Sequence, residues 1–273
     1  QSVISYIHFP RKARFKNAEL KLKKNLKQIV FDLEKILARG LYHTEKMDGL
    51  KIIANSNFTK KIIGQQFKIS ESQIEVIYPP VNIEAFFNST QKKKQVVSIG
   101  RFMPDKLQLQ QIQISKSIPY LDFHLIGFVS DSKESLKYFD ECRNYIAENN
   151  LKNVYLHPNY KFGKMKQIIF QSKYYLHMLE DEPFGITTVQ AIAAGCIPIV
   201  PNSGGQIEIV PIEQLRWDNI QQIADIFNKI ENTNIDHYKK ELQFHIKQFG
   251  NEQFSKKFLK IFDLFGIDDK GGK

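Results

Sequence analysis

The groups best suited to chemistry occur in one short segment, where a carboxylate and a glycine precede a helix. Glu182 stands shortly before Gly185, and a run that favours a helix begins with the two hydroxyl residues Thr187 and Thr188. The first N–H groups of a helix are unpaired and lie at its positive dipole end, so they can hold a phosphate. The Glu182 carboxylate beside them accepts hydrogen bonds from a polyol. The segment predicts a ligand with an anionic part and a sugar-like part, although taken alone it is equally an ordinary loop-to-helix junction.

A second group suited to an anion follows the β-branched run 95–99. Arg101 and Lys106 stand on either side of a turn that contains Pro104. Arginine supplies a planar fork of donors and lysine a compact point charge, and the two together suit a diphosphate. In isolation, this pair is more typical of ordinary surface charge.

A third group is the glycine pair Gly204 and Gly205, which comes soon after the apolar run 197–200. Paired glycines let the backbone approach a ligand closely and can form an anion-binding nest, although they also mark simple tight turns. All three groups follow predicted strands, and ligands of open parallel sheets collect beyond the carboxyl ends of the strands. Their common position favours one cleft for a nucleoside diphosphate over three coincidences.

The elements that position these groups alternate between short β-branched runs and longer amphipathic stretches. This alternation predicts an α/β fold in which parallel sheets are covered by helices on both faces. The predicted strands are residues 3–8, 50–54, 75–78, 95–99, 122–127, 153–157, 174–178 and 197–200.

The alternation is interrupted between Tyr78 and Lys94, where two prolines and a polar stretch are typical of a linker. We therefore predict three parts: residues 1–90, 91–245 and 246–273. The first part holds too few strands for a complete doubly wound domain. We expect the tail from Asn219 to be helical, with Asp218 as its N-cap, and to pack back on other parts of the molecule. Because the chain starts at Gln1 and not at methionine, we interpret it as a piece of a longer protein.

The net charge of +10 favours an anionic partner, and the 42% hydrophobic content is ordinary for a globular protein. No apolar run is long enough to cross a bilayer, and no pattern typical of a metal site is present. A basic cluster in residues 11–27 overlaps residues 17–38, which carry an apolar stripe, so the cluster is either a solvated helix face or a contact with an anionic membrane. Nucleic acid is not favoured, because no aromatic or recognition-helix pattern accompanies the lysines. The cluster consists of Arg11, Lys12, Arg14, Lys16, Lys21, Lys23, Lys24 and Lys27.

Taken in order along the chain, these motifs resemble those of the retaining glycosyltransferases of the GT-B fold, in family 4. The matching pieces are Gly100-Arg101-Phe102-x-Pro104-Asp105-Lys106, Glu182-Pro183-Phe184-Gly185-Ile186 and Gly204-Gly205-x-x-Glu208-Ile209-Val210. Weaker matches are Tyr6-Ile7-His8-Phe9-Pro10, Ala54-Asn55-Ser56-x-x-Thr59 and Val76-Ile77-Tyr78-Pro79-Pro80-Val81. The resemblance implies two Rossmann-like lobes, of which this chain supplies the donor-binding lobe and the end of an incomplete first lobe.

The resemblance also implies roles for single residues. Arg101 and Lys106 bind the diphosphate, Glu182 contacts the transferred sugar as the first acid of the family's Glu-x7-Glu motif, and His8 lies near the donor sugar. Residues implied to bind the donor are Gly100, Phe184, Gly185, Ile186, Thr187, Gln190, Gly204 and Gly205. Neither a metal nor another cofactor is implied, since the two cations and the helix end neutralise the leaving group.

One residue departs from the family pattern. The second acid of the motif is replaced by Gln190, at the position that binds the ribose hydroxyls. A carboxylate accepts from two hydroxyls at once, whereas an amide offers one accepting oxygen and a donating nitrogen. Ribose binding should therefore weaken.

The activity implied by the resemblance is transfer of a hexose from a GDP- or UDP-sugar to a lipid-linked or glycan acceptor, with retention at the anomeric carbon. We expect a cytoplasmic protein that contacts the membrane peripherally. The alternative is a nucleotide-sugar-binding or regulatory subunit without turnover, and assays of transfer separate the two.

Overall fold

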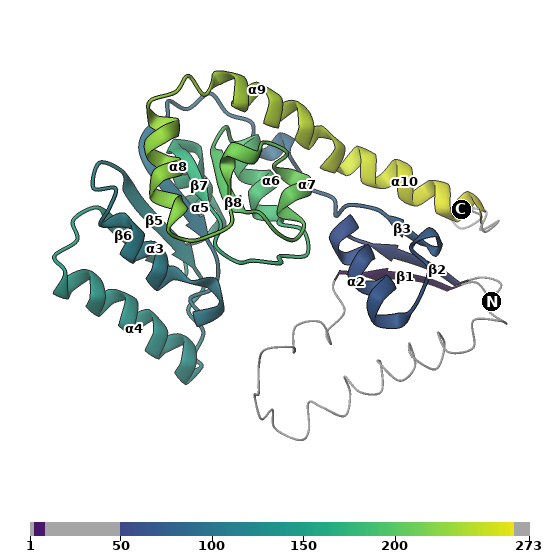
Figure 1. Ribbon diagram of the computed structural model, residues 1–273, viewed down its shortest axis with the longest axis horizontal. Helices are drawn as coiled ribbons and strands as arrows, with labels where there is room; N and C mark the ends of the chain where they lie inside the picture. Colours follow the sequence, from purple (N-terminus) through teal and green to yellow (C-terminus); the bar gives the residue numbers. More distant parts are fainter. Residues whose placement is uncertain (1–2, 9–49, 265–273) are drawn as a thin grey trace. The chain divides into compact units, whose positions relative to one another are not determined.

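The computed structural model describes residues 3–8 and 50–264, whose contacts form two units (Figure 1). The first unit comprises Gln1–Pro79 together with Phe254–Lys273, and the second comprises Pro80–Gln253. These limits fall near the predicted 90 and 245. They do not coincide with them, because Val81 donates its N–H to the Phe249 carbonyl at 3.0 Å and so packs with the second unit.

A parallel sheet in the order β1-β2-β3 forms the centre of the first unit. Its strands are β1 (Val3–Ile7), β2 (Leu50–Ala54) and β3 (Ile74–Val76). Helix α2 (Asn57–Phe67) follows β2, and a 3-10 turn, η3 (Glu71–Gln73), leads into β3. Alternate residues of β2 face opposite sides, as a strand period of two requires.

Each side of β2 belongs to a different apolar cluster. Ile52 and Ala54 pack with Ile63 of α2, whereas Ile53 packs with Ile77 and Ile261. Ile261 lies on α10 (Asn251–Leu264). The C-terminal helix therefore completes the core of the first unit, which confirms that the tail packs back on another part of the molecule.

The second unit is built on a six-stranded sheet in the order β6-β5-β4-β7-β8-β9, with every pairing parallel. Its strands are β4 (Lys93–Ile99), β5 (Asp122–Gly127), β6 (Val154–Pro158), β7 (Ser172–Leu176), β8 (Ile197–Pro201) and β9 (Arg216–Trp217). All five residues of β8 are buried, so both faces of the sheet are covered there. The predicted α/β class with parallel sheets is confirmed.

Helices connect these strands and cover them. They are α3 (Gln108–Ser115), α4 (Lys133–Glu148), α5 (Phe162–Gln171), α6 (Ile186–Ala193), α7 (Gln206–Ile209), α8 (Gln222–Glu231) and α9 (Asp236–His245). The 3-10 turns are η4 (Glu84–Phe86), η5 (Pro104–Lys106), η6 (Glu213–Leu215) and η7 (Ile246–Phe249).

Two details of the sequence analysis were wrong at the end of this sheet. Strand β9 was missed, because two residues are too few to show an alternating pattern. Asp218 is not a helix cap: its N–H donates to Gln222 Oε1 at 2.8 Å, and α8 begins only at Gln222.

The strand order creates a switch point between β4 and β7, which are neighbours in the sheet but distant in the sequence. From β4 the chain moves outward to β5 and β6, and from β7 it moves outward in the other direction to β8 and β9. The loops that leave β4 and β7 therefore diverge, and a crevice at such a point is the usual ligand site of an open α/β sheet.

Several predictions lie outside the described residues. The basic segment 11–27 and the helix predicted over residues 17–38 are among them, so both interpretations of that segment stay predictions. Within the described ranges, no helix is both long and apolar enough to span a bilayer.

The start of α2 provides a test of the first unit. Ser56 is fully buried, and its Oγ accepts the N–H of Thr59 at 2.9 Å. We expect Ser56→Ala to lower the free energy of unfolding by about 1 kcal/mol, because an orphan N–H loses its partner. Urea denaturation measures this. Ser70→Ala is the matched control, since Ser70 precedes η3 without a capping bond. An equal effect of both substitutions would contradict the capping role.

Candidate functional site

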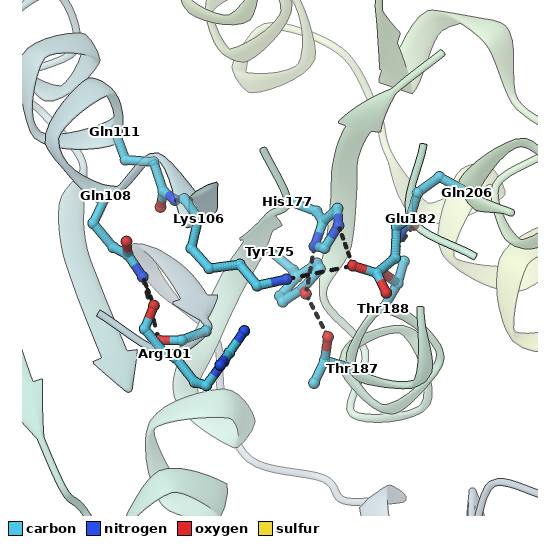
Figure 2. A network of polar contacts seen from close by, with 11 residues as sticks. Arg101, Lys106, Gln108, Gln111, Tyr175, His177, Glu182, Thr187, Thr188 and Gln206 are labelled. Atoms are coloured by element: carbon cyan, nitrogen blue, oxygen red, sulfur yellow. Dashed lines mark hydrogen bonds and ion pairs between the residues drawn. The ribbon is translucent and has the colours of Figure 1, made fainter. Parts of the chain in front are cut away.

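The loops that follow β4 and β7 meet through one pair of opposite charges. Lys106 Nζ lies 3.5 Å from Glu182 Oε2, and both side chains are about four-fifths buried, with exposed fractions of 20% and 22%. Figure 2 shows Arg101 and Lys106 extending from the same loop in the direction of the Glu182 segment. The structure thus brings two of the predicted motifs together at the switch point of the sheet.

Two buried glutamines of α3 hold the loop that carries the cations. Gln108 donates from Nε2 to the carbonyl of Arg101 at 2.7 Å and to that of Gly100 at 3.3 Å. Gln111 donates to the carbonyl of Lys106 at 3.2 Å. Both glutamines are nearly inaccessible to solvent. These two glutamines were not predicted as site residues, since glutamine on an amphipathic helix is normally a surface residue.

Gly185, which directly precedes α6, has a backbone conformation that favours glycine. Gly185 has φ 117°, a value that side chains rarely adopt, and a Cβ there would collide with the amide of Gln206. No side chain caps α6. The N–H of Thr188 already donates to the Gly185 carbonyl at 3.0 Å, so the backbone donors of the first turn that suit a ligand are those of Ile186 and Thr187. Their position beside Glu182 supports the predicted combination of phosphate and polyol.

Gly204 and Gly205 contact the backbone of the loop that carries Glu182. The N–H of Gly205 donates to the Glu182 carbonyl at 2.8 Å. A Cβ on Gly205 would lie 2.5 Å from the Pro183 carbonyl oxygen, and one on Gly204 would lie 2.6 Å from that of Glu182. Because these two glycines have no side chains, their loop can lie directly against the loop that carries Glu182. Direct contact of these glycines with a ligand stays a prediction.

A chain of polar groups links α6 to Glu182 (Figure 2). Thr187 Oγ1 lies 2.8 Å from Tyr175 Oη, which lies 3.4 Å from His177 Nδ1. On the other side of the ring, His177 Nε2 lies 3.9 Å from Glu182 Oε2. His177 was placed inside a predicted strand. Because β7 ends at Leu176, it is in fact the first residue beyond the strand, a position that could have identified it.

The imidazole in this chain is neutral. Burial, helped by the positive charge of Lys106, lowers the pKa of His177 to about 3, while a backbone contact with Leu179 acts in the opposite direction. Burial also raises the pKa of Tyr175 to about 12, so its phenol keeps its proton. The charged residues predicted for the site are Arg101, Lys106 and Glu182, so two cations lie near one carboxylate there.

The other predicted donor contacts lie around this centre. The ring of Phe184 is buried against Phe249, with the ring centroids 5.3 Å apart, so only its backbone can serve a ligand. Ile186, the first residue of α6, is 42% exposed, and Gln190 lies one turn further on and is half-buried. Their contact with a ligand stays a prediction.

His8 belongs to the first unit, where it directly follows β1. Its side chain is exposed, and its carbonyl accepts a hydrogen bond from Thr59 Oγ1 at 3.3 Å. The role of His8 near a donor sugar also stays a prediction. In the part of the chain that the structure describes, no three His, Cys, Asp or Glu side chains gather in a way that suits a metal ion.

Comparison with known protein families gives one match. The model of "Glycosyl transferases group 1" matches residues 82–240, which include every site residue of the second unit named above except Phe249.

Curated relatives resemble the chain over most of its length. The human GDP-Man:Man(3)GlcNAc(2)-PP-Dol alpha-1,2-mannosyltransferase is 24% identical, over 76% of this chain and 47% of its own length. The Dictyostelium discoideum alpha-1,3/1,6-mannosyltransferase ALG2 is 26% identical, over 93% of this chain and 67% of its own length. The chain thus spans about half the length of the human enzyme.

Among solved structures, Anabaena HepE in complex with UDP superposes with a TM-score of 0.76 at 17% identity, covering 96% of this chain and 72% of that one. A glycosyltransferase from Rickettsia africae gives a TM-score of 0.72 at 16% identity, covering 98% and 71%. These similarities show a shared fold, the GT-B architecture expected from the sequence motifs.

The contact between Gly205 and the loop that carries Glu182 can be tested by adding one methyl group. We expect Gly205→Ala to lower the free energy of unfolding by about 1–3 kcal/mol, because the new Cβ forces two loop backbones apart. Gly163→Ala is the matched control, since a Cβ there meets nothing within 4 Å. Chemical denaturation of both variants measures the difference. If Gly205→Ala were as stable as the wild type, the two loops would not be in contact as described.

Proposed function

The chain belongs to the glycosyl transferases group 1 family, and from this membership and the geometry of the site we propose that it moves a hexose from a nucleotide-diphosphate sugar to an acceptor hydroxyl. We place it in family 4 and propose that the configuration at the anomeric carbon is retained. Neither a metal nor another cofactor takes part in the proposed reaction.

The observation that carries this proposal is the contact of Lys106 with Glu182 at the switch point between β4 and β7. A nucleotide-sugar needs cations for its diphosphate and an acceptor for its sugar hydroxyls, and the two loops present these groups side by side. The uncapped start of α6 adds backbone donors for a phosphate.

The work of the site is electrostatic. When the bond between the sugar and the diphosphate breaks, negative charge grows on the leaving nucleoside diphosphate. Arg101, Lys106 and the positive end of α6 stabilise that charge, and they are already in place before the reaction, so little reorganisation is needed. Glu182 accepts hydrogen bonds from the sugar and holds it for attack.

The names of the relatives support a narrower proposal for the substrates. Both mannosyltransferases named above, one of them with a GDP-Man donor and a dolichol-linked acceptor in its name, favour mannose and a lipid-linked glycan. The UDP bound to the structural neighbour makes a UDP-sugar the second choice of donor.

Gln190 favours one alternative function. If an amide at this position binds ribose too weakly for turnover, the protein is a nucleotide-sugar-binding or regulatory subunit. Calorimetry with GDP, UDP, GDP-mannose and UDP-glucose tests binding, and a transfer assay with a lipid-linked oligosaccharide tests turnover. Binding with transfer supports the enzyme, binding without transfer supports the subunit, and no binding of any of the four ligands contradicts both.

The diphosphate site can be tested by removing its cations. We expect Arg101→Ala and Lys106→Ala each to weaken binding of the preferred nucleoside diphosphate by about tenfold to a hundredfold, because a charge-assisted hydrogen bond contributes roughly 1.5–3 kcal/mol. Calorimetry gives the affinities. Arg143→Ala, which removes an exposed arginine of α4, is the control. Unchanged affinity in both site variants would remove the proposed phosphate site.

The ribose site can be tested by restoring the acid of the family motif. We expect Gln190→Glu to tighten binding of GDP or UDP but not of the 2′-deoxy analogue, because a carboxylate accepts from two hydroxyls. Gln113→Glu adds the same charge at an exposed position of α3 and is the control. Equal gains for the ribo- and deoxyribonucleotide would mean that residue 190 does not face the ribose.

A further inference from the structure

His177 is the buried polar group nearest to Glu182 whose purpose the proposed function leaves open. The residue is 8% exposed, and its Nε2 atom is buried without a hydrogen-bond partner. Glu182 Oε2 lies 3.9 Å from this nitrogen. A buried polar atom that lacks a partner costs free energy, so its retention beside the site calls for an explanation.

The protonation of the ring follows from its neighbours. The Glu182 carboxylate only accepts, so we assign the hydrogen of the neutral ring to the nitrogen that faces it, while the ring also has a backbone contact with Leu179. His177 Nδ1 is then an acceptor, and Tyr175 must donate its hydroxyl hydrogen to it. Thr187 in turn donates to Tyr175 Oη. The hydrogen bonds therefore run in one direction, from α6 towards Glu182.

The two oxygens of Glu182 are used differently. Lys106 Nζ and His177 Nε2 both approach Oε2, at 3.5 Å and 3.9 Å. Among the described residues, no hydrogen bond or ion pair is made to Oε1. One oxygen is thus approached from two sides, while the other stays available to accept from a ligand hydroxyl.

We propose that His177 is a positioning residue: its Nε2–H, oriented through Tyr175 and Thr187, holds Glu182 Oε2 so that Oε1 faces the hydroxyls of the transferred sugar. This inference rests on the proposed function, since it assigns the sugar to Glu182. It also couples the phosphate-binding end of α6 to the sugar-binding carboxylate, because Thr187 is in the first turn of that helix. The spacing between diphosphate and hexose is then set by one chain of polar contacts.

The orientation of the ring is tested first, in the protein without ligand. Nitrogen-15 NMR of the 273-residue chain distinguishes a protonated from an unprotonated ring nitrogen. We expect His177 to carry its hydrogen on Nε2, and Tyr175→Phe to raise the population with hydrogen on Nδ1. Tyr174→Phe is the matched control, because Tyr174 is equally buried on β7 but donates to Glu231. Hydrogen on Nδ1 in the wild type would overturn the proposal.

The effect on the sugar is tested with two variants of nearly equal size. Glutamine can place a donor N–H near the position of His177 Nε2, whereas methionine cannot. We expect His177→Met to weaken binding of GDP-mannose or UDP-glucose by about tenfold, the loss of roughly one hydrogen bond to a charged group, while binding of GDP or UDP is unchanged. His177→Gln should stay within about threefold of the wild type for all four ligands.

The possible results are distinguishable. Equal losses in His177→Met and His177→Gln, or equal losses for the nucleotide and its sugar conjugate, would show a merely structural role and overturn the proposal. Unchanged nucleotide-sugar affinity in His177→Met would also overturn it. If the wild-type chain bound none of the four ligands, the proposed function would fail, while the NMR result would still decide whether His177 directs a hydrogen towards Glu182.

Discussion

The pairing of β4 with β7 is the constraint on which the site depends. Lys106 and Glu182 are far apart in the sequence, and they face each other only because these two parallel strands are neighbours and end at the same edge of the sheet. Parallel strands need long crossovers, so their carboxyl ends can gather loops from distant parts of a chain. The buried glutamines under one loop and the glycine pair under the other then reduce the freedom of both.

The packing around this edge explains how a charged site is maintained in a folded protein. Lys106 and Glu182 are mostly buried, but each offsets the charge of the other, and Arg101 remains exposed. The polar backbone of the loops is satisfied from within, by Gln108 on one side and by the N–H of Gly205 on the other. The functional groups are thus supported by residues that have no direct contact with a ligand in the proposed function.

The predictable part of this structure is the part encoded locally. β-Branched runs gave the strands from β1 to β8 to within a few residues, and strand-end position pointed to Arg101, Lys106 and Glu182. The order of the strands was not predictable, because it depends on which buried faces fit each other across the sheet. Gln108 and His177 were missed for a related reason: each lies in a pattern typical of a helix surface or a strand, and only the fold turns them towards the loops.

The return of α10 to the first unit has a consequence for synthesis. Among the described residues, Ile53 and Ile77 pack against Ile261, so this apolar cluster of the first sheet cannot form until residue 261 has been made. The second unit, in contrast, is contiguous from Pro80 to Gln253 and can close its core as soon as it leaves the ribosome. The cluster around Ile53 is therefore completed after the second unit, and during elongation its apolar side chains are a natural substrate for chaperones.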